Sequence, residues 1–209
     1  MPKCYVVLEP HADDAFLSVG SHIERWVKAG DRVHIVTFFP VERTSLRDAE
    51  NYAVSVGATW TGWTLPGAGE KIPKRPEHAP TWWWGREPDT QFTMENWLGL
   101  NDGWGWEVQL ILPLGGAPVD QNPHTRDHED VRKRFEHEGV WYYVDQPYAI
   151  IKKHSERFTE KLKDMRTVSY LKPGANKWKR GVPIFKSQAK FFHFNEGNLP
   201  KTFEMLVRK

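Results

Sequence analysis

Apolar residues in the first 65 positions alternate between strand-like runs and helix-like spacing. From Phe16, for example, they recur at helical spacing until Gly30, a residue type that often ends helices. This β-α-β-α-β order predicts a parallel sheet with right-handed crossovers, and it resumes after residue 106. We therefore expect an α/β fold whose Rossmann-like, mostly parallel sheet is flanked by helices. The expected strands are 4–8, 32–39, 59–65, 107–113 and 140–144, and the expected helices run from about 16 to 29, 45 to 57 and 128 to 138.

Three segments depart from this pattern. Residues 66–106 are rich in Gly, Pro and Trp, so we expect an irregular insert there. Loops of this length inside a domain are often functional. A loop is also expected at 114–127, and residues 151–209 are expected to be mostly helical with basic faces. Since 209 residues are the size of one α/β domain, we expect a single domain over 1–209.

Positive charge is concentrated in residues 151–209. This part has 15 Lys and Arg against 5 Asp and Glu, a net charge of +10, whereas the whole chain carries only +2. Such a segment is compatible with a polyanionic partner, either nucleic acid or anionic lipid. The alternative is a solvated helical surface, and the charge pattern leaves both open.

Composition excludes several other classes of protein. The longest apolar stretches fall far short of the roughly 20 residues of a membrane span, so no transmembrane segment is expected. The first residues lack the apolar region of a signal peptide. A single cysteine, Cys4, excludes an internal disulfide framework and a Cys-based zinc ribbon. We therefore expect a soluble, cytoplasmic protein.

Two clusters of metal-ligating residue types each follow an expected strand. Residues 10–14 contain a histidine and two aspartates, and residues 124–128 contain two histidines and one aspartate. Ligands of open α/β sheets bind outside the carboxyl ends of the strands, so the two clusters can meet there and hold a divalent metal. Adjacent residues of a turn point in different directions, so one of Asp13 and Asp14 would bind the ion and the other would face its water as general base. Helix capping by either aspartate is the alternative.

Four segments, taken in order, resemble the motifs of the PIG-L/LmbE-like de-N-acetylases, in the branch with the signature PHxDDA. The resemblance covers about residues 4–65 and 107–150, and it leaves out the insert and the basic C-terminal part. The matching segments are Pro-His-Ala-Asp-Asp-Ala-Phe-Leu-Ser-Val-Gly at 10–20, Arg-Asp-Ala-Glu at 47–50 with Val-Gly-Ala at 56–58, Leu-Pro-Leu-Gly-Gly at 112–116 with Asp-His at 127–128, and Tyr-Val-Asp-Gln-Pro-Tyr-Ala at 143–149.

The resemblance implies a reaction and a set of residues for it. The implied reaction is hydrolysis of the N-acetyl group of an N-acetylglucosamine-type amino sugar, with Asp13 as the general base that activates a zinc-bound water. Asp127 would be a carboxylate that orients a histidine. The ion would be Zn²⁺, and a site of two histidines and one carboxylate also suits Fe²⁺. The implied metal ligands are His11, Asp14 and His128, and the implied substrate contacts include Arg47 and Tyr148.

The chain departs from the family pattern at two places. Ser21 stands where the signature has its second Gly, and Thr125 stands where the family has a histidine three residues before the last ligand. His124 would replace that histidine, which stabilises the oxyanion or protonates the leaving group, unless it is an exposed loop residue. The insert holds a Trp cluster that includes Trp84, which would either line a glycan groove or attach the insert to the core.

The acceptor that carries the acetylated sugar is not predicted from the sequence, and two other functions stay open. The first is a metal amidase that acts on a non-sugar substrate or on a sugar attached to nucleic acid. The second is a non-catalytic relative that binds glycan or nucleic acid. Arg47 likewise would contact either the substrate or a neighbouring acidic residue of its own helix.

Overall fold

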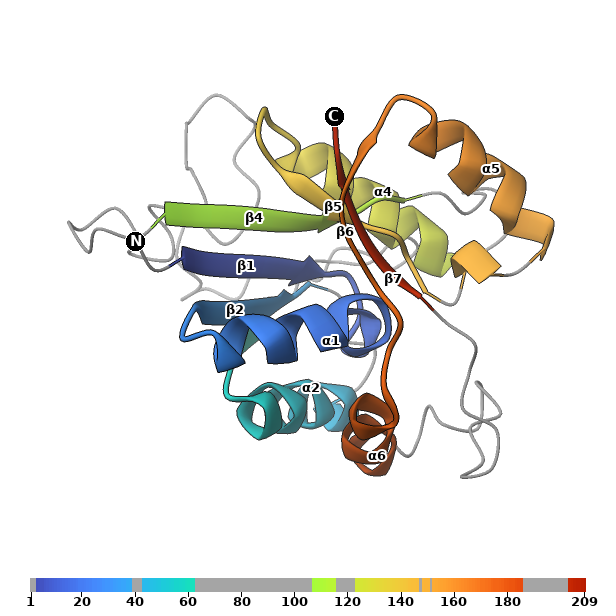
Figure 1. Cartoon of the computed structure of the whole chain (residues 1–209). Helices are drawn as coiled ribbons and strands as arrows, with labels where there is room; N and C mark the ends of the chain where they lie inside the picture. The colour runs from blue at the N-terminus through green and yellow to red at the C-terminus, as the bar shows by residue number, and fades with distance from the viewer. Residues whose placement is uncertain are drawn as a thin grey trace, which may run out of the picture.

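The computed structural model describes residues 3–38, 43–62, 107–115, 123–146, 148–150, 152–185 and 203–209. They form a seven-stranded sheet with helices on both faces (Figure 1). The strands are β1 (Lys3–Glu9), β2 (Arg32–Thr37), β3 (Thr59–Gly62), β4 (Glu107–Pro113), β5 (Trp141–Tyr143), β6 (Arg166–Leu171) and β7 (Glu204–Arg208). The helices are α1 (Asp14–Lys28), α2 (Arg43–Val56), α4 (Pro123–Phe135), the short η1 (Tyr148–Ile150), α5 (Lys152–Leu162) and α6 (Ala175–Ile184).

The strand order is β3-β2-β1-β4-β5-β7-β6, and the first five strands are mutually parallel. This confirms the expected α/β fold with a mostly parallel sheet. The chain leaves β1 toward β2 and β3 on one side, then returns to β4 on the other side of β1. The carboxyl ends of β1 and β4 therefore flank the point where the strand order reverses, which is where open α/β sheets bind ligands.

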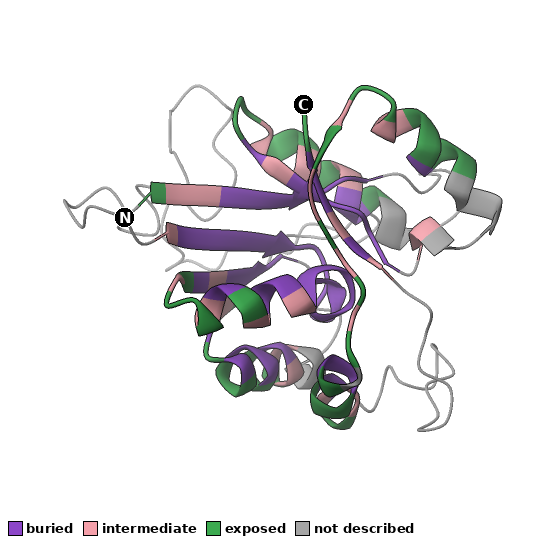
Figure 2. Ribbon diagram, in the orientation of Figure 1, coloured by how far each residue is buried: buried purple, intermediate pink, exposed green. Residues whose placement is uncertain are grey.

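Each face of the sheet has its own apolar core. α1, α2 and α6 cover one face, α4 and α5 cover the other, and their outward sides are exposed (Figure 2). On the first face, the ring of Phe16 stacks on Phe185 at 5.2 Å and meets Tyr52 and Trp178 edge-on. A Cβ at Gly181 would lie 2.1 Å from the Phe16 ring, so α6 packs this close only because it has glycine there.

A buried ion pair ties α6 and β7 to α1. The ammonium of Lys177 donates to Glu204 Oε1 at 2.6 Å and to the backbone oxygen of Leu17 at 2.8 Å. The Glu204 carboxylate also accepts from the backbone N–H and hydroxyl of Ser21 at 2.9 Å and contacts the ring of His22. Both charged side chains are almost fully buried, so they stabilise each other where water does not reach. We call this group the Lys177–Glu204 clamp.

The structure refines two further expectations. Residues 151–209, which we expect to be mostly helical, contain the helices α5 and α6 but also the strands β6 and β7, and β7 runs antiparallel between β5 and β6. Short apolar runs of this kind are ambiguous between strand and helix, and their pairing partner lies far away in the sequence. The expected loop at 114–127 is also too long, because α4 already begins at Pro123, the residue type favoured in the first helical turn.

Two further expectations concern the insert at 66–106 and the absence of a transmembrane segment. The insert at 66–106, Trp84 included, lies outside the described residues. Within the described part of the chain, no helix has the length and apolar character needed to cross a bilayer.

Candidate metal centre

The first cluster lies in the turn between β1 and α1. The backbone N–H of His11 donates to Asp14 Oδ2 at 2.8 Å, and the N–H of Asp14 donates back to the carbonyl of His11 at 3.1 Å. Asp13 occupies the position before the first helical residue, but its side chain makes no capping hydrogen bond. Its carboxyl group is therefore not used as a helix cap, which weakens the capping alternative for this residue.

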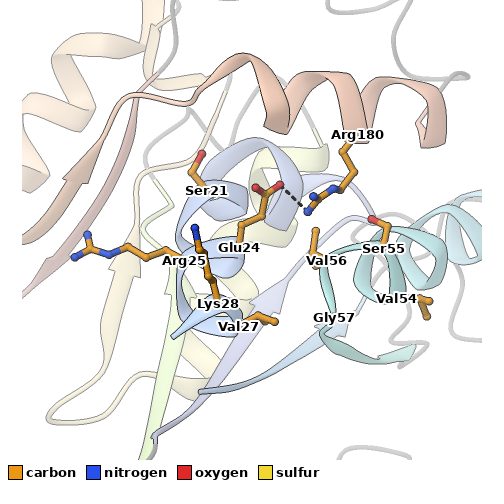
Figure 3. A pocket seen from close by; sticks show the side chains of 10 residues that line it. All are labelled: Ser21, Glu24, Arg25, Val27, Lys28, Val54, Ser55, Val56, Gly57 and Arg180. Carbon is orange, nitrogen blue, oxygen red and sulfur yellow. Dashed lines mark ion pairs between the residues drawn. The ribbon is translucent and has the colours of Figure 1, made fainter. Parts of the chain in front are cut away.

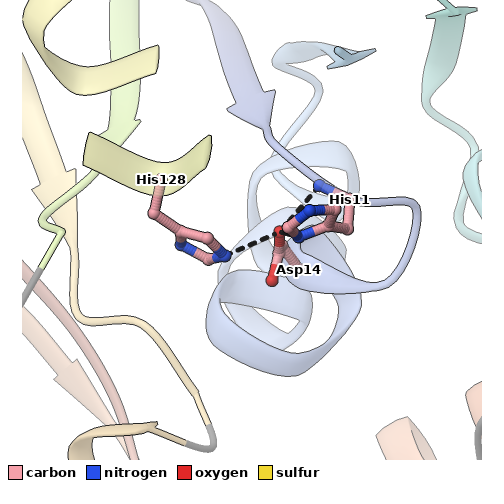
Figure 4. Close-up of side chains that lie close together, drawn as sticks. All are labelled: His11, Asp14 and His128. Atoms are coloured by element: carbon pink, nitrogen blue, oxygen red, sulfur yellow. Dashed lines mark hydrogen bonds and ion pairs between the residues drawn. The ribbon is translucent and has the colours of Figure 1, made fainter. Parts of the chain in front are cut away.

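The turn meets the second cluster, which α4 brings from the neighbouring strand. One ligating atom each of His11, Asp14 and His128 lies within 4.8 Å of the others, and all three residues are buried. Asp14 Oδ2 is 3.3 Å from His11 Nδ1 and 3.2 Å from His128 Nε2. Figure 4 shows the three side chains turned toward one another. β1 pairs with β4, the strand that precedes α4, so the sheet topology itself brings the two clusters together.

Each histidine is backed by a carboxylate on its other ring nitrogen. Asp127 Oδ2 lies 3.0 Å from His11 Nε2, and Asp145 Oδ1 lies 2.5 Å from His128 Nδ1. This arrangement fixes the ring and leaves the inner nitrogen to bind a metal. Asp127 thus contacts a histidine, as expected, but it contacts His11 rather than its sequence neighbour His128.

Asp145 is the functional residue that sequence reasoning missed. It stands in the Tyr-Val-Asp-Gln-Pro-Tyr-Ala segment after β5, so the signal was present, but nothing in the segment indicates which histidine the carboxylate faces.

The donor set fits a divalent metal ion. His128 Nε2 is buried and makes no hydrogen bond, although it faces the carboxylate of Asp14. Two imidazole nitrogens and one carboxylate oxygen are the ligands of many catalytic zinc sites and of non-haem Fe²⁺ sites. An ion at this place would bind this nitrogen and would neutralise the buried aspartate.

The surroundings of the two neighbouring aspartates shift their pKa values in opposite directions. Burial, and then the negative charge of Asp14, raise the pKa of Asp13 from 3.8 to about 7. Burial also acts to raise the pKa of Asp14, but the imidazoles of His128 and His11 lower it well below its ordinary value. Asp14 is therefore the ionised partner of the histidines, whereas Asp13 can take up and release a proton near neutral pH.

Several solved structures share the fold of the chain. The zinc-inhibited form of teicoplanin deacetylase is 16% identical with a TM-score of 0.59, and the match covers 94% of this chain and 89% of that chain. A deacetylase–teicoplanin complex is 17% identical with a TM-score of 0.56 and covers 99% of both chains. The A40926 pseudoaglycone deacetylase is 15% identical with a TM-score of 0.52 and covers 98% of this chain and 95% of that chain.

The chain has the PIG-L/LmbE-like de-N-acetylase fold. The fold implied by the sequence motifs is thereby confirmed. No protein-family model matches the sequence, and no curated protein matches it.

Beneath the candidate metal centre lies a second residue that sequence reasoning did not single out. Glu9, at the end of β1, is buried and accepts from the backbone N–H of Ala15 at 2.9 Å and from the hydroxyl of Thr37 at 2.5 Å. Burial raises the pKa of Glu9 to about 8, although the hydrogen bonds from Thr37 and Ala15 act to lower it. Glu9 joins the ends of β1 and β2 to the first turn of α1, which carries Asp14.

Among the remaining predicted site residues, only Tyr148 has a described contact with the candidate metal centre. The ring of Tyr148 meets the ring of His128 edge-on, with centroids 5.7 Å apart. Arg47 is exposed on α2. His124 belongs to the first turn of α4, but its side chain lies outside the described part, as does Trp84.

A surface pocket of about 690 Å³ lies between α1, α2 and α6 (Figure 3). Lys28 and Gly57, at the carboxyl ends of α1 and α2, help to line it, and an ion pair between Arg180 and Glu24 crosses it. None of the predicted site residues lines this pocket. In a parallel sheet, the carboxyl ends of the helices lie at the edge opposite the carboxyl ends of the strands, so the pocket is remote from the metal centre.

Proposed function

We propose that the chain is a metal-dependent hydrolase that removes the N-acetyl group from an N-acetylglucosamine-type amino sugar. The observation that carries this proposal is the buried set His11, Asp14 and His128, with Asp13 beside it. The sequence motifs and the shared deacetylase fold support the choice of an acetylated sugar as substrate. We take residues 1–209 as one deacetylase domain.

In the proposed reaction, three residues would bind the metal ion and Asp13 transfers the proton. A Zn²⁺ or Fe²⁺ ion held by His11, Asp14 and His128 would act as a Lewis acid toward the acetyl carbonyl. Asp13 takes a proton from the attacking water, whose oxygen adds to the carbonyl carbon, and delivers it to the nitrogen as the C–N bond breaks. The products are acetate and a free amine. The pKa of Asp13, raised by burial, suits both proton transfers.

Four further residues are proposed to act on the substrate. Tyr148 lies against the ring of His128, so its phenol is the best placed to contact the sugar. We also propose Arg47, from the family resemblance, and Trp84, from the Trp cluster of the insert, as substrate contacts. His124, next to Thr125, is proposed to stabilise the oxyanion or protonate the leaving group.

The described structure leaves less positive charge for a polyanion than the sequence predicts. Five basic residues of the C-terminal part form ion pairs with acidic residues, so we do not propose nucleic acid or lipid as a partner. They are Lys161, Lys163, Lys177, Arg180 and Lys209.

The test combines metal content with acetate release. Wild-type protein is expected to hold about one Zn²⁺ or Fe²⁺ per chain, His128→Ala to hold none, and wild type to release acetate from N-acetylglucosamine or its glycosides. Asp13→Asn should keep the metal and lose turnover by roughly 10²- to 10⁴-fold. Asp164→Asn, an exposed aspartate, is the matched control.

Three outcomes would contradict the proposal. A wild type that stays metal-free in excess zinc would show that the three ligands do not assemble. Glycan binding without acetate release would favour a non-catalytic binding protein. Acetate release only from acetylated substrates without a sugar would favour an amidase of another class.

A further inference from the structure

A continuous line of hydrogen bonds runs from α5 to the metal centre. The ammonium of Lys161 donates to the backbone oxygens of Leu114, at 3.3 Å, and of Gly115. The N–H of Gly115 donates to Asp145 Oδ2 at 2.8 Å, and the other oxygen of Asp145 contacts His128 Nδ1 at 2.5 Å. The line therefore ends on the imidazole whose inner nitrogen faces Asp14.

One peptide unit links the two halves of this line. The C=O of Leu114 and the N–H of Gly115 belong to the same peptide group, which receives the Lys161 ammonium at its oxygen and presents its N–H to the Asp145 carboxylate. A positive charge at the oxygen and a negative charge at the N–H both act along the peptide dipole, so each contact strengthens the other. Asp145 is 1% exposed, which makes such contacts stronger than they would be in water.

The backbone at Gly115 is built for this contact. Its φ of +60° lies in the left-handed region that favours glycine. A Cβ there would also lie 2.6 Å from Glu129 Oε2, the carboxylate oxygen that accepts from Lys161 at 3.0 Å. Glycine thus lets α4 and the Lys161 side chain approach the end of β4.

The Lys161 side chain is held from its other side as well. Glu129 on α4 forms a two-point ion pair with Arg132, whose Nη2 lies 2.5 Å from Oε1 and whose Nε lies 3.2 Å from Oε2. Because Arg132 stays paired with Glu129 when Lys161 is replaced, the loss of this lysine leaves no isolated acidic group. A variant at Lys161 is therefore expected to fold.

We propose that Lys161 is a positioning residue for the metal centre. From α5 it holds the Leu114–Gly115 peptide so that the Gly115 N–H fixes Asp145, and Asp145 in turn fixes the ring of His128. The inference rests on the proposed function in one respect, namely that His128 binds a metal ion.

The test compares zinc affinity and the state of His128 in four proteins. Wild type, Lys161→Met, Lys161→Arg and Lys163→Met are titrated with Zn²⁺ against a competing chelator. Lys163 is the matched control because it lies on the surface just after α5 and pairs only with Glu160 among the described contacts. The Nδ1–H resonance of His128 is followed by NMR in ¹⁵N-histidine-labelled protein, with and without zinc, and thermal unfolding shows that each variant is folded.

Lys161→Met is expected to weaken zinc binding roughly threefold to tenfold, less than the 10- to 100-fold typical of a direct partner of a ligand. It should also shift the His128 Nδ1–H resonance, Lys161→Arg should restore both, and Lys163→Met should match wild type. A Lys161→Met variant with unchanged affinity and resonance would overturn the inference. If wild type takes up no zinc, the proposed function fails, and the resonance in metal-free protein still decides whether Lys161 positions His128.

Discussion

Replacing Glu204 with Gln is expected to destabilise the protein by about 3 kcal/mol at neutral pH. The Glu204 carboxylate is fully buried and accepts hydrogen bonds from Ser21 and from the Lys177 ammonium. Glutamine keeps the shape of the side chain but removes its charge. The Lys177 ammonium then stays in the core without a counter-ion, which is the costly result of breaking a buried pair.

The pKa of Glu204 gives a second route to the same magnitude. Burial acts to raise this pKa, but the Lys177 charge and the hydrogen bonds from His22 and Ser21 lower it from 4.5 to about 2. One pKa unit corresponds to about 1.4 kcal/mol, so the lowering corresponds to about 3 kcal/mol of stability at neutral pH. Burial also lowers the pKa of Lys177 in spite of the pair. The double variant Lys177→Met/Glu204→Gln should therefore be less destabilised than the sum of the single variants.

The stability difference has a predicted pH dependence. A carboxyl group whose pKa is lower in the folded state stabilises the protein above its unfolded pKa, and this stabilisation is lost as the pH falls through the folded pKa. The difference between wild type and Glu204→Gln should thus be constant above about pH 5 and shrink from about pH 4.5 toward about pH 2. Urea unfolding followed by tryptophan fluorescence measures it. A difference below about 1 kcal/mol at neutral pH, or one that stays constant down to about pH 3, would refute this account of the clamp.

Three further predictions concern the site and the core. Asp145→Asn should weaken zinc binding roughly 10- to 100-fold without loss of fold, and competition with a chelator would measure the change. A variant with wild-type zinc affinity would mean that His128 needs no carboxylate partner to bind zinc. Burial acts to lower the pKa of His11, but Asp127 and Asp14 raise it to about 9. Zinc binding should therefore displace a proton from His11, and the zinc affinity should rise with pH up to about 9. Calorimetry in buffers of different ionisation enthalpy would detect the released proton, and its absence at neutral pH would contradict the assignment of His11 as a ligand. Gly181→Ala should lower stability by about 1–3 kcal/mol or more because its Cβ would overlap Phe16, and an unchanged melting temperature would show that α6 can move away.

The two clusters that form the candidate metal centre could be predicted because each follows a strand of a recognisable pattern, whereas the choice of His11, Asp14 and His128 within them came from the family resemblance. Their partners could not, since contacts between side chains depend on how helices are turned. Asp127 precedes His128 in the sequence, yet successive helical residues point about 100° apart, so its carboxylate reaches His11 instead. Asp145 reaches His128 because β5 lies next to β4. No local segment of the sequence indicates that these two strands are neighbours.

The C-terminal part shows the same limit for charge and for strands. Composition predicts a basic surface, but Lys177 is buried in the clamp, and only the tertiary structure provides its partner Glu204. The pairing of β7 with β5 joins segments about 60 residues apart, beyond the reach of periodicity.

The position of β7 also has a consequence for biosynthesis. Until residues 204–208 have been made, β5 is an edge strand whose backbone groups are free to pair with another chain. The nascent polypeptide thus already contains all three proposed metal ligands while its sheet is still open beside the segment that carries Asp145. Aggregation during synthesis should be greatest in this interval, and a chaperone that shields strand edges would act on this intermediate rather than on the finished protein.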